Sequence, residues 1–297
     1  MTIEEVVEAA QSGNVAAMNL LGDAFREEIK MRDAAEWYER AANLGDVYGK
    51  QMALYTWLIW ASACEGTGAY DDAVTSWQSG YRMMMAVAED TSISEEERNQ
   101  ALAHRPEILC GIGANLYFLQ KKDEALEPLF RAAEERNLMA RVVLGMTYQT
   151  NSTEQNWVED FKRSIPLMES LFNASFKYEK SSQLDQKIVY LAHRMLAETY
   201  RKGLGGMNSN IERAYQCLLH LQSLNLSNFA NEVAAELQKY HKIMNASDYN
   251  KYLSAIKAAN DAQNKEALVR IKSSLIAEYG LEDNDVDYLI RQFRYNV

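Results

Sequence analysis

Histidines and cysteines are the residues of this chain whose types could support catalysis or metal binding. The four histidines are His104, His193, His220 and His241, and none forms an HExxH phrase or lies near a cysteine at the spacing of metal ligands. The three cysteines are widely spaced within apolar segments of helical pattern, which is typical of buried reduced thiols and not of a disulfide framework. We therefore expect no metal site and no activated thiol.

A glycine cluster is the other feature that could carry chemistry. Gly203, Gly205 and Gly206 could suggest a phosphate-binding loop, but no Lys-Ser/Thr pair follows them and no strand-like segment precedes them. A turn between two helices explains the cluster better. The chain has no GxSxG phrase, and its carboxylates are too numerous for any pair to stand out. We expect no catalytic residue and no cofactor.

The composition indicates an ordered helical protein. Of 297 residues, 47% are hydrophobic and 25% are charged, which suffices for a substantial core. Only 3 prolines occur among abundant Ala, Leu, Glu and Met, and this favours helix almost throughout, with no sheet.

Charge and hydropathy restrict the functional class. The net charge of -11 and the lack of a basic stripe argue against nucleic-acid binding. No segment approaches the ~18 apolar residues that a membrane span requires. The N-terminus has neither a basic nor an apolar signal region, so we expect a cytoplasmic protein without a membrane span.

The elements that would position any site are repeated helix pairs. In the first unit, Leu21, Gly22 and Phe25 lie on one helical face, and Ala34 to Asp46 form a second helix closed by a turn. A step of 12 residues joins the small residues of the two helices, and it recurs in three units at Gly22 and Ala34, Ala61 and Ala73, and Gly113 and Ala125.

Two further units follow with longer connections. The fourth opens with Ala140, Leu144 and Gly145 and continues into a polar connection from Thr150 to Glu159, which is either a functional loop or a tolerated insertion. The fifth contains Ala197 and Ala214, which are 17 residues apart and enclose the glycine cluster.

These phrases resemble the tetratricopeptide superfamily, and specifically its Sel-one-like branch. The resemblance rests on A-x3-L-G-x2-Y/F in units one and four, WY-x2-AA-x2-G in unit one and Y-x2-G-x-GG in unit five. It implies an all-α fold, a right-handed α-α superhelix built as a solenoid of antiparallel helix pairs. Residues 1–226 would form about five pairs, with irregular connections near 88–105 and 150–163, and 227–297 a helical C-terminal cap of the same solenoid.

The resemblance also implies where a partner would bind. In proteins of this type the first helix of each pair lines a concave groove, at the second, fifth, ninth and twelfth places of the repeat. The matching positions of this chain are Asn19, Asp23, Arg26, Tyr55, Leu58, Ser62, Glu65, Glu107, Tyr117, Gln149, Arg194, Glu198 and Arg201.

We therefore expect a non-catalytic scaffold or adaptor that binds a peptide or protein segment in this groove. One alternative is a regulatory protein that senses a peptide and changes its superhelical pitch. Another is an enzyme with a carboxylate or histidine in the groove. A purely architectural subunit would instead carry a large apolar patch. The sequence does not identify the partner or the oligomeric state.

Overall fold

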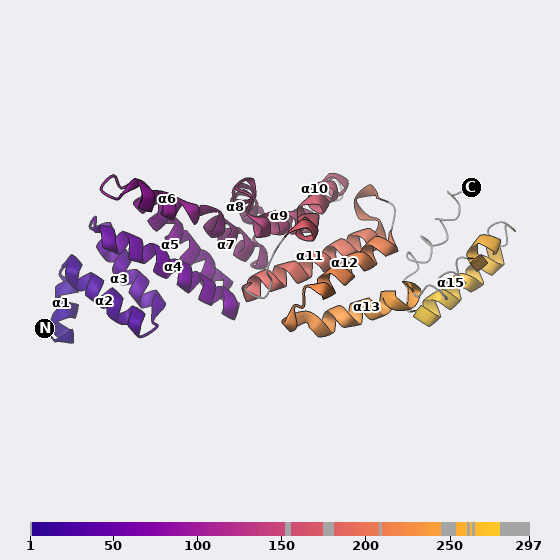
Figure 1. The fold of residues 1–297 in the computed structure, drawn as a ribbon, viewed down its shortest axis with the longest axis horizontal. Coiled ribbons are helices and arrows are strands. Elements are labelled where there is room, and N and C mark those ends of the chain that lie inside the picture. Colours follow the sequence, from indigo (N-terminus) through magenta and orange to yellow (C-terminus); the bar gives the residue numbers. More distant parts are fainter. Residues whose placement is uncertain are drawn as a thin grey trace. The chain divides into compact units, whose positions relative to one another are not determined.

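The chain is all-α in the computed structural model, which describes residues 2–151, 156–174, 181–207, 210–244, 254–259, 262 and 265–279. No strand occurs in these segments, and consecutive helices pack on their neighbours in chain order (Figure 1). The expected all-α class is confirmed. The helices of the first half are α1 (Ile3–Gln11), α2 (Val15–Glu27), α3 (Met31–Asn43), α4 (Val47–Thr67), α5 (Tyr70–Ala88), α6 (Glu95–Ala103), α7 (Arg105–Phe118) and α8 (Lys122–Glu134).

The second half continues the pattern with shorter 3-10 turns between the helices. Its elements are α9 (Leu138–Asn151), α10 (Trp157–Glu169), η1 (Ser170–Asn173), α11 (Gln183–Lys202), η3 (Leu204–Gly206), α12 (Ile211–Ser223), η4 (Ser227–Phe229), α13 (Ala230–Met244) and α15 (Lys265–Tyr279).

Two compact units divide the chain. The first holds residues 1–147 with 182–184, and the second holds 148–181 with 185–297. The division therefore falls inside α9. That residues 227–297 form a cap stays a prediction, and the segments 245–253 and 280–297 of this region lie outside the described residues.

Side-chain caps fix where several helices begin. The side chains of Asn14, Asp46 and Asn137 each accept a hydrogen bond from the backbone amide three residues on, over 2.7–3.0 Å. These bonds satisfy amides that have no partner within the helix. At Thr2 and Ser94 the structure has capping boxes, in which the cap and a glutamate three residues later bond to each other's backbone.

Two glycines let neighbouring helices approach closely. A Cβ placed on Gly22 in α2 would lie 2.6 Å from the Tyr38 ring of α3, and one on Gly113 in α7 would lie 2.5 Å from Leu129 of α8. Each glycine precedes its large partner by 16 residues. The sequence motif therefore pairs a hole on the first helix with a knob on the second.

A shared carboxylate joins α2, α3 and α4. The hydroxyls of Tyr38 and Tyr48 both donate to Oδ1 of Asp23, over 2.6 and 2.9 Å. Burial, and then the bond to Asp23, raises the pKa of both tyrosines, so their hydroxyls remain donors. Asp23 thus holds α2 to α3 and to the start of α4.

α7 is the most enclosed helix of the first unit. Ten consecutive residues, Ile108 to Tyr117, are buried, because α5 and α8 pack against different sides of this helix. Gly111 gives room to the Trp77 ring of α5, which a Cβ would approach to 2.4 Å. Trp77 Nε1 and Asn115 Nδ2 both donate to Glu65 Oε1, over 2.7 and 2.6 Å, so Glu65 links α4 to α5 and α7.

The two expected irregular connections contain helix. Between 88 and 105 lies α6, which begins at the Ser94 capping box. Near 150–163 the expectation requires correction, because α9 continues to Asn151 and α10 already begins at Trp157, while 152–155 lie outside the described residues. Glu159 and Asp160 in the first turn of α10 favour this earlier start, since acids stabilise a helix N-terminus.

Several inter-helix turns are left-handed without glycine. Ile29, Gln120, Arg136 and Asn225 have φ between 50° and 65°. An L-residue in this region costs about 1–2 kcal/mol, and glycine is the usual choice for it. The chain uses the same backbone turn at Gly45, so both glycine and non-glycine residues occupy such turns.

We predict that Gly22→Ala destabilises the first unit by about 1–3 kcal/mol, since the added methyl group overlaps the buried Tyr38 ring, which Asp23 holds in place. Gly66→Ala is the matched control. Gly66 is in α4 with nothing within 4 Å of its Cβ position, so this change should stabilise by about 0.5–1 kcal/mol. Urea unfolding of both variants measures the difference, and equal effects would contradict the packing described here.

Candidate functional site

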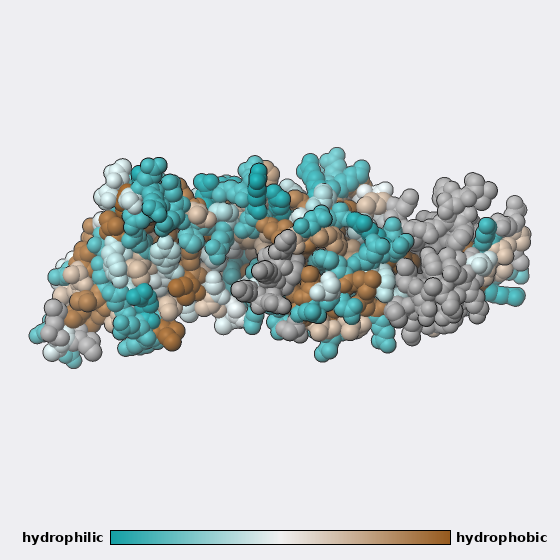
Figure 2. Space-filling view, in the orientation of Figure 1, coloured by the Kyte–Doolittle hydropathy of each residue, from teal (hydrophilic) through white to brown (hydrophobic). Residues whose placement is uncertain are grey.

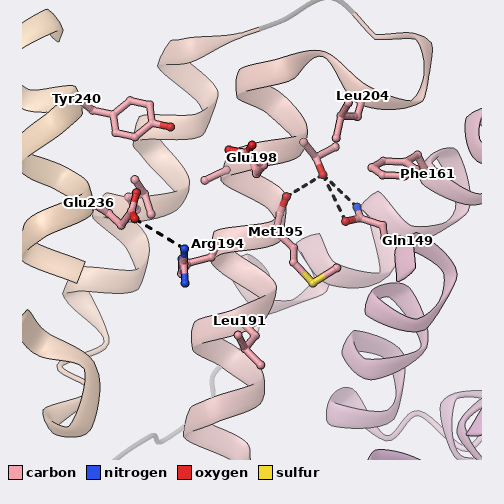
Figure 3. Close-up of a pocket in the computed structure, with 12 residues that line it drawn as sticks. Gln149, Phe161, Leu191, Arg194, Met195, Glu198, Leu204, Glu236 and Tyr240 are labelled. Atoms are coloured by element: carbon pink, nitrogen blue, oxygen red, sulfur yellow. Dashed lines mark hydrogen bonds and ion pairs between the residues drawn. The ribbon is translucent and has the colours of Figure 1, made fainter. Parts of the chain in front are cut away.

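A cavity among the described residues lies in the second unit, over α11. Its volume is about 380 Å³, near the lower end of ligand pockets. α11 runs through its centre, α13 provides one side, and α9 with α10 provides the other (Figure 3). The lining residues are Gln149, Phe161, Leu191, Arg194, Met195, Ala197, Glu198, Thr199, Leu204, Leu218, Glu236 and Tyr240.

An ion pair stands on the α13 side of this pocket. Arg194 Nη2 lies 3.8 Å from Glu236 Oε1, and the two side chains are 46% and 29% exposed. The guanidinium also lies 5.5 Å from the centroid of the Tyr190 ring, which stacks on Phe229 with centroids 4.4 Å apart. Such an open, long pair contributes at most about 1 kcal/mol, so a ligand charge can compete for either member.

Glu198 carries a fixed negative charge beside this pair. Arg201 donates to both of its carboxylate oxygens over 2.9 and 2.8 Å, and Lys202 Nζ lies 2.6 Å from Oε1. Burial alone would raise the pKa of Glu198, but the bonds from Lys202 and Arg201 outweigh it and hold the pKa below its ordinary value. The carboxyl therefore stays ionised and is poorly suited to donate a proton near neutral pH.

A buried polar network forms the opposite side. Gln149 Nε2 donates to Ser164 Oγ over 2.9 Å and to Thr199 Oγ1 over 3.2 Å, which links α9, α10 and α11. The Thr199 hydroxyl donates a hydrogen bond to Met195 O over 2.7 Å. Gln149 Oε1 then has only a 3.4 Å contact with Thr199, which leaves it able to accept a hydrogen bond from a ligand.

The helices that carry the pocket are joined by a second carboxylate, that of Glu169. The Tyr200 hydroxyl donates to Glu169 Oε1, and Arg213 Nη2 pairs with the same oxygen at 2.7 Å. Burial and the bond to Glu169 raise the pKa of Tyr200, so it remains a donor. This arrangement ties the ends of α10, α11 and α12 together, as Asp23 ties α2, α3 and α4 in the first unit.

The structure brings together part of the predicted groove. Gln149, Arg194 and Glu198 all line the pocket, and Arg201 lies beside it as the partner of Glu198. Their positions follow from α11, where Arg194, Glu198 and Arg201 share a face at helical spacing, and from the end of α9.

Most predicted groove residues of the first unit have structural partners. Asn19 Nδ2 donates to Asp46 over 2.8 Å, Asp23 bonds two tyrosines, and Glu65 accepts from Trp77. These polar side chains join helices, which explains their presence without a partner. That these side chains also bind a protein or peptide partner stays a prediction.

The other predicted positions of the first unit differ in exposure. Tyr117 is 8% exposed, which leaves it little surface for a partner. Tyr55 is 42% exposed and meets His104 edge-on at 5.7 Å. Leu58 is half-buried against the backbone position of Gly80. Exposed positions complete the set, namely Arg26, Ser62 and Glu107.

Exposed apolar side chains of the first unit are dispersed. On the face drawn in Figure 2, brown and teal residues alternate over these helices and form no broad apolar patch. The large ones lie in α2, α4, α8 and two turns, and they are Leu20, Ile29, Leu44, Tyr48, Tyr55, Ile59 and Phe130. This dispersal gives no support to an architectural subunit on this face.

Sequence reasoning missed the pocket residues outside the repeat frame. Glu236 and Tyr240 come from α13, which was assigned to the cap, and Phe161 comes from the part of α10 that was expected to be irregular. The i, i+4 spacing of Glu236 and Tyr240 marks one helix face. It does not indicate which helix this face meets.

The histidines and cysteines occupy buried or structural places. All three cysteines are buried thiols, and burial raises the pKa of Cys64, and that of Cys217 to about 12. Among the residues that the structure describes, no group of three His, Cys, Asp or Glu is placed to hold a metal ion. The side chain of His241 lies outside the described residues.

Comparison with known proteins gives no relative. No model of a protein family matches the chain, and no curated protein matches it. Within the described segments, no helix has the length and apolar character needed to cross a bilayer.

We predict that Thr199→Val destabilises the second unit by about 1–2 kcal/mol, because one amide hydrogen of Gln149 loses its acceptor at the pocket wall. Thr75→Val is the matched control. Thr75 makes the same kind of bond to the carbonyl four residues earlier, but it is exposed on α5 and should change stability by less than about 0.5 kcal/mol. Thermal and urea unfolding compare the two, and equal losses would contradict a supporting role for the network.

Proposed function

We propose that this protein is a non-catalytic, helical-repeat binding protein that holds a peptide or protein segment in the pocket over α11. The observation that carries the proposal is the convergence of Gln149, Arg194 and Glu198, predicted from the repeat frame, on one cavity. The finer proposal is a solenoid of tetratricopeptide or Sel-one-like helix pairs, with a right-handed superhelix and a cytoplasmic location. The partner is protein or peptide, not nucleic acid.

The chemistry of the lining supports a peptide. Leu191, Met195 and Leu218 offer an apolar floor for a side chain, while Gln149 Oε1 can accept a main-chain N–H. Arg194 and Glu236 can each meet a charge of opposite sign. Apolar anchoring with a few fixed polar groups is the usual basis of peptide recognition.

The non-catalytic part of the proposal is supported by the state of the ionisable groups. Glu198 is held ionised by two cations, and His193 is fully buried away from the pocket lining. A general acid or base needs a pKa near the working pH and access to the substrate. A peptide-sensing regulator remains the alternative, and it differs by a ligand-dependent change in solution scattering.

We predict that Met195→Glu weakens peptide binding at least about tenfold, since it places a charge on the apolar floor where a side chain would be buried. Probe peptides are selected from a random display library on the wild-type protein, and their affinities are measured by fluorescence polarisation. Circular dichroism confirms that each variant is folded.

Arg163→Gln is the matched control for this test. Arg163 is a 62% exposed residue of the same unit outside the pocket lining, so its removal should change affinity less than about twofold. Tyr55→Ala reports on the first unit. Loss of binding with Tyr55→Ala but not with Met195→Glu would place the site in the first unit. Selected peptides whose affinity is unchanged in both variants would overturn the proposal.

A further inference from the structure

Two histidines form a direct hydrogen bond inside the second unit. His193 Nε2 of α11 lies 2.8 Å from His220 Nδ1 of α12, and their rings are inclined by 19°. His193 Nδ1 lies 2.8 Å from Val189 O, one turn earlier on the same helix. His193 is completely buried and His220 is partly exposed.

These contacts fix the positions of the protons. A carbonyl oxygen only accepts, so His193 Nδ1 carries a hydrogen and donates it to Val189. Neutral His193 then has a lone pair at Nε2, and His220 must supply the hydrogen from Nδ1. The basic nitrogen left to the pair is His220 Nε2, on the partly exposed ring.

The pair can therefore accept one proton without loss of the bond, but not two. A first proton at His220 Nε2 leaves His220 Nδ1–H pointing at the His193 lone pair. A second proton has only His193 Nε2 to occupy, and two N–H groups would then face each other across 2.8 Å between two cations. The hydrogen bond becomes a repulsion at that step.

Among the residues that the structure describes, no carboxylate forms a hydrogen bond or ion pair with either ring. Phe172 of η1 covers both rings, with centroids 5.4 Å from His193 and 4.8 Å from His220. The charged groups of the surrounding elements are engaged elsewhere, Glu169 of α10 with Arg213 of α12, and Arg194 of α11 with Glu236 of α13. Burial is the main cause that lowers the pKa of His193 to about 4 and that of His220 below its ordinary value.

We propose that His193 and His220 form an acid-operated latch, which keeps α11 and α12 together when it holds no proton or one proton and separates them when it takes up a second. The direction of the pH dependence of folding stability follows from the burial of the neutral pair. The unfolded chain binds a proton at each histidine near pH 6.5, and the folded pair resists it, so stability is lost as the pH falls from about 6.5 towards 4.

The latch bears on the pocket, and this consequence rests on the proposed function. α11 carries Leu191, Arg194 and Met195 in the pocket lining, while Leu218 of α12 closes its floor two residues before His220. Separation of the two helices at the latch would displace Leu218 and release a bound segment in acid. The latch itself requires no ligand, so it can be tested alone.

The experiment is an NMR titration of the whole chain with 15N-labelled histidine side chains, from pH 7.5 to pH 3, which extends below the pKa of His193. At pH 7.5 we expect a scalar coupling across the hydrogen bond between His193 Nε2 and His220 Nδ1. It should persist as His220 takes the first proton and vanish with the second. At that point amide exchange in α11 and α12, corrected for intrinsic pH dependence, should accelerate at least about tenfold relative to α2 and α3.

His220→Asn provides the decisive variant. Its amide can donate to neutral His193 and can turn its carbonyl oxygen to accept from protonated His193, so the latch should stay closed across the titration. His220→Ala should be open already at pH 7.5. His104→Gln, in the first unit, is the control and should leave the acid step unchanged.

Several outcomes would overturn the latch. These are no coupling at pH 7.5, independent titration of both rings near pH 6.5, or acid opening of His220→Asn at the same pH as wild type. If His220→Ala does not fold, the wild-type titration and His220→Asn still decide. A closed latch with no peptide binding at Met195 would refute the proposed function alone, while peptide binding that is unchanged through the acid step would refute the coupling alone.

Discussion

The close approach of paired helices is the constraint on which the rest of this structure depends. At Gly22 and Gly113 the first helix of a pair leaves no room for even a methyl group beneath Tyr38 and Leu129. Packing at this distance excludes water and fixes the relative rotation of the two helices. Once the rotation is fixed, the remaining faces of α2, α4 and α7 are available to the next helix in the chain.

Carboxylates also fix how the helices pack, in addition to the small residues. Asp23 receives two tyrosine hydroxyls, Glu65 receives an indole and an amide, and Glu169 receives a tyrosine and an arginine. In each case one acid on a helix gathers donors from two others. Because an acid buried without its donors is costly, these clusters favour one arrangement of three helices over many similar ones. Polar residues that seemed available for binding are thus part of the scaffold.

The sequence was a good guide to the helices and a weaker guide to the site. Period, capping boxes and small residues predicted the all-α class, because they act within one helix or between chain neighbours. The start of α10 was missed, since Glu159 and Asp160 read as a polar loop although they stabilise a helix N-terminus. The contribution of α13 to the pocket depends on which face of α13 meets α11, and no local pattern encodes that choice. The same holds for His193 and His220, whose contact joins positions 27 residues apart.

The turns at Ile29, Gln120, Arg136 and Asn225 have a consequence for how such a chain can change over time. Glycine is the usual residue at such a helix end, yet the backbone bends at these four positions without it. After Arg136 the side chain of Asn137 caps the next helix, whereas the helices after Ile29 and Gln120 begin without a side-chain cap. A glycine in such a turn can therefore be replaced while the helices on either side of it keep their places.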